Sequence, residues 1–185
     1  MGKTPQEIRD ERLVLECQEG DRAAFGQLVD RWQDRLWRYA RWMTGNEDAA
    51  ADAVQETWLG VARGIRRLED PGAFSAWVYR ICSSRCADHV RAEQRRRQAS
   101  KDAAQAAPSE QAGSEEDPAA EGPEAVRQAV SRLAPDHRQV VALYYGDGLA
   151  VEQIALALEI PEGTVKSRLH YAREQLRQWL ERRHD

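Results

Sequence analysis

Residues 151–169 read VEQIALALEIPEGTVKSRL, and this stretch has the form of two short helices joined by a tight turn. The first helix is expected over 151–158, where the small side chain of Ala155 allows another helix to pack closely across it. The segment IPEG at 160–163 breaks the helical pattern. Thr164 is then the expected N-cap of the second helix. The stretch predicts a helix-turn-helix.

The second helix, expected over 163–183, is amphipathic. At about 100° per residue, one face gathers the apolar side chains of Val165, Leu169, Ala172, Leu176 and Leu180. The opposite face carries polar side chains that can reach base edges or phosphates in a major groove. The predicted DNA-contacting residues are Lys166, Ser167, Arg168, His170, Tyr171 and Arg173, and Arg168, Arg173 and Arg177 are expected to hold phosphates. The alternative interpretation is a packing helix with a solvated charged face.

The charge balance does not argue against a nucleic-acid partner. The 185 residues carry 27 Lys+Arg and 31 Asp+Glu, a net charge of −4. Residues 1–98 hold 17 basic and 16 acidic groups, residues 99–124 hold 1 and 7, and residues 125–185 hold 9 and 8. The middle segment therefore supplies the negative balance, while basic groups cluster locally at 80–97 and 163–185.

That middle segment also predicts the domain organisation. It is rich in Ala, Ser, Pro, Gly and acid and lacks aromatic and branched aliphatic residues, so it cannot bury enough apolar surface to fold. The expected divisions are an N-terminal extension (1–20), a helical domain (21–98), a flexible acidic linker (99–123) and a second helical domain (124–185). A plain solvated tether is the simplest role for the linker.

The first domain is expected to be a helical bundle. Phe25, Leu28, Val29, Trp32, Leu36 and Tyr39 follow a period near 3.6 residues. Gly45-Asn46 ends that helix, and Asn46 is the expected cap of the next, which runs to about 67. A third helix is expected from 74 to 97, after Asp70-Pro71-Gly72. Past the linker, helices are expected over 124–133, 136–145, 151–158 and 163–183. With no sustained period-2 alternation, the fold class is all-α, with two small helical domains.

Several functional classes are excluded or demoted. No apolar run is long enough to span a membrane, and the first residues show no apolar stretch of the kind found in a secretory signal. Three cysteines argue against a disulfide framework, so a cytoplasmic protein is expected. Cys82, Cys86 and His89 are spaced to face one side of a helix, but a fourth metal ligand is not evident. We therefore expect no metal site, no cofactor, no small-molecule substrate and no enzymatic activity; a P-loop motif is absent.

Four segments in chain order resemble one known family. DAAADAVQETW at 48–58 and AFSAWVYRI at 73–81 resemble region 2 of bacterial sigma-70 family sigma factors. LAPDHRQVV at 133–141 and PEGTVKSRL at 161–169 resemble region 4. With two domains and a short linker, the chain is most similar to the extracytoplasmic-function (ECF) group. The resemblance implies a transcription initiation factor whose partners are core RNA polymerase, promoter DNA and a cognate anti-sigma factor, which in this group is often membrane-bound.

The resemblance also implies which residues act. Asp52, Gln55 and Glu56, at i, i+3 and i+4 of one helix, are expected to dock on the clamp coiled coil of the polymerase. The −10 element is expected to be recognised and opened by residues of 74–97, and the expected contacts are Trp77, Tyr79, Arg80, Ser84, Arg85 and Arg91. For Trp77 the sequence favours a place in the core over a stacking contact with a base. Ser84 occupies the position where family members often carry Asn, which leaves the −10 base preference open. The acidic linker would thread through polymerase channels.

Two other functions fit parts of the same sequence. A stand-alone helix-turn-helix regulator would use the C-terminal domain on symmetric operators without polymerase. A protein that mimics a sigma factor to sequester its inhibitor would use the same surfaces without DNA. The basic track at 80–97 argues against the mimic.

Overall fold

The structure is a computed structural model, and it describes residues 3–104 and 123–181. Within these ranges the regular elements are helical, and no helix is long and apolar enough to cross a membrane. The α-helices are α1 (Pro5–Glu19), α2 (Arg22–Thr44), α3 (Glu47–Gly64), α4 (Phe74–Ala104), α5 (Pro123–Ser131), α6 (Pro135–Val141), α7 (Val151–Leu158) and α8 (Glu162–Glu181). Short helical turns lie at η1 (Ile65–Arg67), η2 (Pro71–Ala73) and η3 (Ala142–Gly146).

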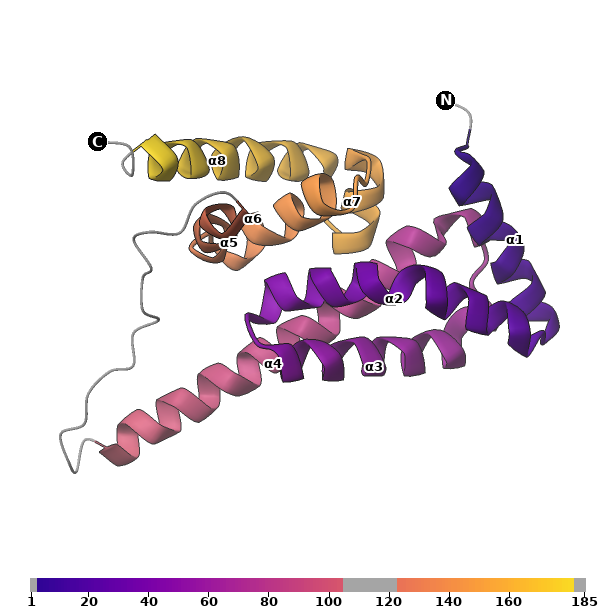
Figure 1. The fold of residues 1–185 in the computed structure, drawn as a ribbon, viewed down its shortest axis with the longest axis horizontal. Helices are drawn as coiled ribbons and strands as arrows, with labels where there is room; N and C mark the ends of the chain where they lie inside the picture. Colours follow the sequence, from indigo (N-terminus) through magenta and orange to yellow (C-terminus); the bar gives the residue numbers. More distant parts are fainter. Residues whose placement is uncertain (1–2, 105–122, 182–185) are drawn as a thin grey trace.

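The first helix, α1, was not expected from the sequence. The Thr4 hydroxyl accepts a hydrogen bond from the Glu7 backbone N–H, and the Glu7 carboxylate accepts one from the Thr4 backbone N–H, so the two form a capping box. Its buried face carries Leu13, Val14 and Cys17, which pack into the bundle. The helix closes one end of the bundle (Figure 1).

The predicted break between α2 and α3 is confirmed. Gly45 ends α2 with φ of 69°, a left-handed conformation that glycine adopts without a steric penalty. The Asn46 side chain accepts a hydrogen bond from the Ala49 backbone N–H at 2.9 Å and so caps α3, as expected. The two helices therefore run antiparallel, and α4 packs against both (Figure 1).

Trp32 is the centre of the first bundle. Its side chain is 2% exposed and meets Phe74 and Tyr79 edge to face, with ring centroids 5.4 and 5.8 Å away. Its indole N–H donates to the Asp10 carboxylate at 3.2 Å, and that carboxylate also pairs with Arg31 at 2.7 Å. The aromatic cluster and the buried acid together fix α1, α2 and α4 to one another.

The C-terminal helices differ in two places from the predicted ones. The expected helix over 136–145 ends as α6 at Val141, and a single π-helical turn, η3, follows. The Leu149 backbone N–H then donates to the Leu143 carbonyl at 3.0 Å. Thr164 does not cap α8, so that prediction was wrong. The helix begins at Glu162, and the Pro161 carbonyl accepts from the backbone N–H groups of Thr164 and Val165 at 2.9 and 3.1 Å.

The helix-turn-helix packs on the first bundle, with α7 against α4. Three polar contacts accompany this packing: Arg80 pairs with Glu159 at 2.7 Å, Gln153 donates to Glu7 at 3.3 Å, and Asp147 lies between Arg35 and Arg38 at 3.4 and 3.8 Å. We call this interface the interdomain junction. Its two sides come from residues more than 70 positions apart in the chain (Figure 1).

Asp147 is the most buried charge of the interdomain junction, because its side chain is only 4% exposed. Arg35 also donates to the Asp147 backbone carbonyl at 3.1 Å. The pKa of Asp147 is nevertheless raised, because burial opposes ionisation more strongly than the two arginines favour it. A raised pKa means that the buried site favours the protonated form of this carboxyl group more than water does.

Candidate nucleic-acid and protein interfaces

The exposed face of α8 carries the predicted DNA-contacting residues. Val165, Leu169 and Ala172 are 0–3% exposed, so they form the expected core face, and Leu176 is half-buried. The side chain of Leu180 lies outside the described residues. The predicted contacts lie away from the core: Lys166, Ser167, His170, Tyr171 and Arg173 are exposed, and Arg168 is half-buried. The helix-turn-helix thus presents one polar helical face to solvent.

Several of these side chains have neighbours within the chain. Lys166 pairs with Glu162 at 3.4 Å, one turn back along α8, and both side chains are well exposed. Arg168 instead reaches across to α6 and pairs with Asp136 at 2.5 Å, with its side chain 23% exposed. Tyr171 is 60% exposed and lies with its ring near His137 of α6. The first turn of α6 therefore lies beside the exposed polar face of α8.

The predicted polymerase-docking residues form an exposed stripe on α3. Asp52, Gln55 and Glu56 are all exposed, while Val54 is 1% exposed and faces the core as expected. Thr57 is also buried, and its hydroxyl donates to the Ala53 carbonyl at 2.7 Å within α3. Glu56 and Asp52 are the two ends of this stripe, and each has different neighbours.

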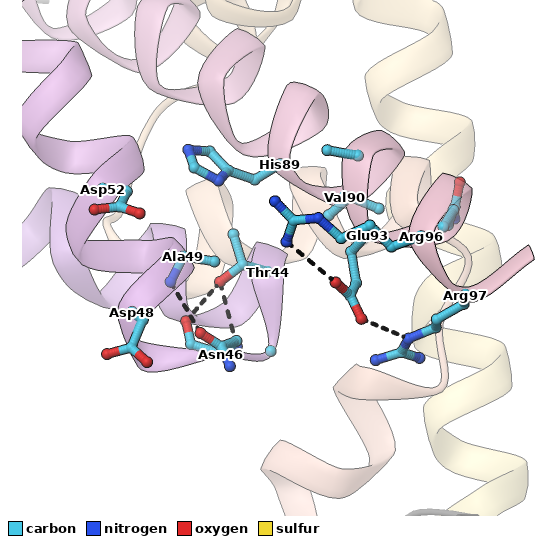
Figure 2. Close-up of a pocket in the computed structure, with 13 residues that line it drawn as sticks. Thr44, Asn46, Asp48, Ala49, Asp52, His89, Val90, Glu93, Arg96 and Arg97 are labelled. Atoms are coloured by element: carbon cyan, nitrogen blue, oxygen red, sulfur yellow. Dashed lines mark hydrogen bonds and ion pairs between the residues drawn. The ribbon is translucent and has the colours of Figure 1, made fainter. Parts of the chain in front are cut away.

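Glu56 connects the stripe to α4. Its carboxylate lies 3.8 Å from Arg85 Nε and 3.9 Å from His89 Nε2. Asp52 instead lines a groove of 590 Å³ between the beginning of α3 and the C-terminal half of α4. Figure 2 shows Asp48 and Asp52 on one side of this groove and His89, Glu93 and Arg97 on the other. The stripe is therefore acidic and borders the basic part of α4.

Four of the six predicted −10 contacts lie on one stripe of α4. Trp77, Arg80, Ser84 and Arg91 are separated by steps of 3, 4 and 7, which share a helical face. Ser84, Arg80 and Arg91 are exposed, although Arg80 is paired with Glu159 and Arg91 with Asp88 at 3.0 Å. Arg85 is half-buried beside Glu56.

Trp77 lies at the edge of the core. Its ring is half-buried and packs so closely on Gly64 that a Cβ at that position would lie 2.9 Å from a ring carbon. Any larger residue at position 64 would push the ring or α3 outward. Trp77 thus has one part of its ring in the core and one part accessible.

Tyr79 does not reach the surface, contrary to the expectation that it contacts DNA. It is 0% exposed, with its ring against Trp32 and Tyr39, because its position on α4 faces α2. Burial raises the pKa of its hydroxyl above the ordinary range. Beside it, Ser83 is also buried and shares a hydrogen bond of 2.6 Å with the Tyr39 hydroxyl.

The cysteines are buried thiols. Cys82 and Cys86 are 0% exposed and lie one turn apart in α4, and His89 is turned toward Glu56. Within 3–104 and 123–181 no group of three or more His, Cys, Asp or Glu side chains is arranged to hold a metal ion. The pKa of Cys86 is raised, by a hydrogen bond with Cys82 and by burial.

The thiols should be unreactive in the folded chain. Burial raises the pKa of Cys17 to about 11, so at pH 8 only about one molecule in a thousand carries the thiolate. Ellman's reagent at pH 8 should therefore label none of the three cysteines within minutes, and all three after unfolding in guanidinium chloride. Rapid labelling of one thiol in the folded chain would contradict the buried placement.

Comparison with protein families identifies the two helical parts. Residues 28–96 match the family model of sigma-70 region 2, and residues 124–176 match that of sigma-70 region 4. A region 2 bundle followed by a region 4 helix-turn-helix defines a transcription initiation factor of the sigma-70 class.

Relatives narrow this class to one group. The chain is 34% identical over 167 residues to the ECF RNA polymerase sigma factor SigE of Mycolicibacterium smegmatis, covering 87% of this chain and 64% of that relative. It is 29% identical over 191 residues to SigW of Bacillus subtilis, covering 94% and 98%. It is 33% identical over 180 residues to the ECF sigma-E factor of Escherichia coli, covering 91% and 93%. The chain belongs to the ECF RNA polymerase sigma factors.

Solved structures show the same fold. The structure of CnrH in complex with the cytosolic domain of CnrY matches with a TM-score of 0.71 at 25% identity, covering 94% of this chain and 97% of that one. The sigma factor RpoE of Bartonella quintana, solved with the anti-sigma factor NepR, matches with a TM-score of 0.64 at 22% identity, covering 85% and 96%. The chain is thus a factor that directs RNA polymerase to promoters, and the matches to region 2 do not favour a stand-alone regulator.

Proposed function

We propose that α3 and α8 divide the work of initiation in this chain. Asp52, Gln55 and Glu56 on α3 bind core RNA polymerase. The exposed face of α8 enters the major groove of the −35 element, where the residues proposed to contact DNA are Lys166, Ser167, Arg168, His170, Tyr171 and Arg173. The observation that carries the proposal is that α8 has one buried and one exposed face: Val165 and Leu169 are buried, while Lys166 and His170 are exposed. A helix seated in this way can insert its polar face between two phosphate backbones.

The −10 element is assigned to α4. Arg80, Ser84 and Arg91 line its exposed face, and Trp77 and Arg85 border them. Separating a base pair there costs about 1.4 kcal/mol of stacking, which phosphate contacts and an accessible aromatic edge can offset. Tyr79 is left out of this assignment, because it is fully buried. All three arginines would have to exchange their present carboxylate partners for DNA.

The chain is further proposed to work without chemistry of its own, in the cytoplasm with the polymerase, under the control of an anti-sigma factor. Support for the last point is the likeness to CnrH, whose structure was solved with the cytosolic domain of CnrY. In that view the division at 21–98 and 124–185 corresponds to the two DNA-contacting parts, and the residues between them connect the two.

The direct test is in vitro transcription. Purified full-length chain is combined with bacterial core RNA polymerase on a library of promoter fragments, and core enzyme alone is the control. Transcripts with fixed start sites that need the chain support the proposal and give both promoter elements. Tight binding of the chain to palindromic duplexes, with no transcript from core plus chain, would instead show a stand-alone regulator.

Substitutions on α8 should change promoter choice. Lys166→Ala or His170→Ala should weaken selection of the −35 element by roughly tenfold, since a base-reading contact contributes about 1–3 kcal/mol. Affinity for core polymerase should change little, because both residues lie far along the chain from the α3 stripe. Competition between fragments with selected and scrambled −35 elements measures the effect, and Gln175→Ala, exposed further along α8, is the control. Equal losses of polymerase affinity and −35 selection would contradict the assignment of α8.

A further inference from the structure

One arginine of the DNA-facing side of α8 is held in place by another helix. Arg168 pairs with Asp136 of α6 at 2.5 Å, across 32 residues of sequence. A guanidinium has five N–H donors in a fixed plane, so one contact with a carboxylate orients the group and leaves donors for a phosphate. Lys166, by contrast, pairs only along its own helix and is 63% exposed.

A second DNA-facing side chain is held by the same turn of α6. The Tyr171 ring stacks on His137 with centroids 6.4 Å apart and planes 28° apart, while His170 meets it at 64°. His137 Nδ1 is buried and has no hydrogen-bond partner among the described residues. Its ring is therefore placed by packing. Arg168 and Tyr171 are three residues apart, so both lie on the side of α8 that faces α6.

The first turn of α6 is itself firmly anchored. The Arg138 guanidinium donates to the backbone carbonyls of Ser131 and Leu133, at 3.0 Å for Leu133, and so ties α6 to the end of α5. Burial lowers the pKa of Arg138 from its ordinary value. Next in sequence, Val140 and Val141 are 0% and 3% exposed. Asp136 and His137 therefore project from a fixed support.

We propose that Asp136 and His137 are positioning residues for −35 recognition, which orient Arg168 and Tyr171 before DNA binds. This inference rests on the proposed function of α8 and extends it to α6. Asp136 has a second effect, because a carboxylate beside the DNA backbone opposes binding to any sequence. The charge lowers binding to every sequence alike, whereas orientation favours the correct site, so orientation raises the ratio of specific to non-specific binding.

The test compares two acids of the same charge at the same surface. Holoenzyme is assembled from core polymerase and full-length chain carrying Asp136→Asn, Glu162→Gln or no substitution. Each holoenzyme is offered fragments with the selected or a scrambled −35 element in competition. Among the residues that the structure describes, Glu162 pairs with exposed Lys166 alone, so Glu162→Gln is the matched control for loss of one negative charge.

Asp136→Asn should strengthen binding to the scrambled fragment and leave the selected fragment nearly unchanged, so that the ratio falls about fivefold. Glu162→Gln should strengthen both equally and keep the ratio within about twofold. His137→Ala should lower the ratio without strengthening binding to the scrambled fragment. Equal behaviour of Asp136→Asn and Glu162→Gln would overturn the inference, because the carboxylate would then act by charge alone.

Lys166→Ala separates this inference from the function on which it rests. If Lys166→Ala lowers the ratio and Asp136→Asn does not, the positioning role is wrong and the α8 interface stands. If Lys166→Ala leaves the ratio unchanged, the α8 interface and the positioning role are both overturned. Melting temperatures of the variants, measured alongside, separate an altered ratio from a loss of folded chain.

Discussion

Replacing Asp52 and Gln55 together with alanine should weaken binding of the chain to core RNA polymerase by roughly 30-fold, since hydrogen bonds that involve a charged group contribute about 1.5–3 kcal/mol each and neutral ones less. Both side chains are exposed on one face of α3. Their loss removes the proposed contacts without opening the core. Selection of the −35 element by the holoenzyme that still forms should be unchanged, because the residues proposed to read it lie on α8.

Equilibrium titration of labelled chain with core enzyme measures this effect. The control is Gln27→Ala with Asp30→Ala on α2, which removes the same two side-chain types at the same spacing from another exposed surface. The α2 pair should change the affinity by less than about twofold, as for surface substitutions in general. Equal losses from the two pairs would show that the α3 stripe is not the docking surface.

Trp32→Ala should destabilise the first bundle by about 4 kcal/mol, within the range found when a large aromatic side chain is removed from a core. The ring is 2% exposed and in contact with Phe74 and Tyr79, and its N–H is a partner of the buried Asp10 carboxylate. The substitution therefore leaves a cavity and removes one donor from a buried charge. Both effects act in the same direction.

Urea unfolding followed by far-UV circular dichroism measures the free energy of unfolding. Trp37→Ala is the matched control, because Trp37 lies on the same helix and is half-buried. Trp37→Ala should lower the free energy of unfolding by about half as much as Trp32→Ala or less, because a smaller area of the Trp37 side chain is withdrawn from water. Similar costs for the two substitutions would mean that the cluster around Trp32 is not the centre of the bundle.

The sequence predicted those elements whose cause is local. Gly45 and Asn46 end one helix and begin the next because each acts on its immediate neighbours. The buried face of α8 followed from spacing alone, since the helical period fixes which residues share a face. The helix α1 could also have been predicted from local sequence. Thr4 and Glu7 have the residue types and spacing of a capping box, and Leu13, Val14 and Cys17 repeat at helical spacing.

The features that the sequence did not predict, a buried side chain and two long-range ion pairs, depend on how the helices pack against one another. Tyr79 is a polar aromatic residue beside an exposed arginine, and only the packing of α4 against α2 turns it inward. The pair between Asp136 and Arg168 joins residues 32 positions apart, and the pair between Arg35 and Asp147 joins residues 112 apart. Neither pairing has a spacing rule, because both result from tertiary geometry. The docking residues themselves remain a prediction that rests on family resemblance.

The interdomain junction has a consequence for promoter search. The −35 and −10 elements are named by their positions upstream of the transcription start, so they lie about 25 base pairs apart, which is roughly 85 Å of duplex. The longest helix, α4, has 31 residues, or about 46 Å. If α4 and α8 read the two elements as proposed, the arrangement with α7 seated on α4 has to open before both elements are occupied.

Under the proposed function, promoter binding then selects an open arrangement, and the free energy of opening is subtracted once from the binding free energy of every promoter. Each 1.4 kcal/mol of closure reduces the apparent affinity for all promoters tenfold without altering their rank. The strength of the junction around Asp147 thus works as a threshold on the amount of factor that the cell must release before any of its promoters responds.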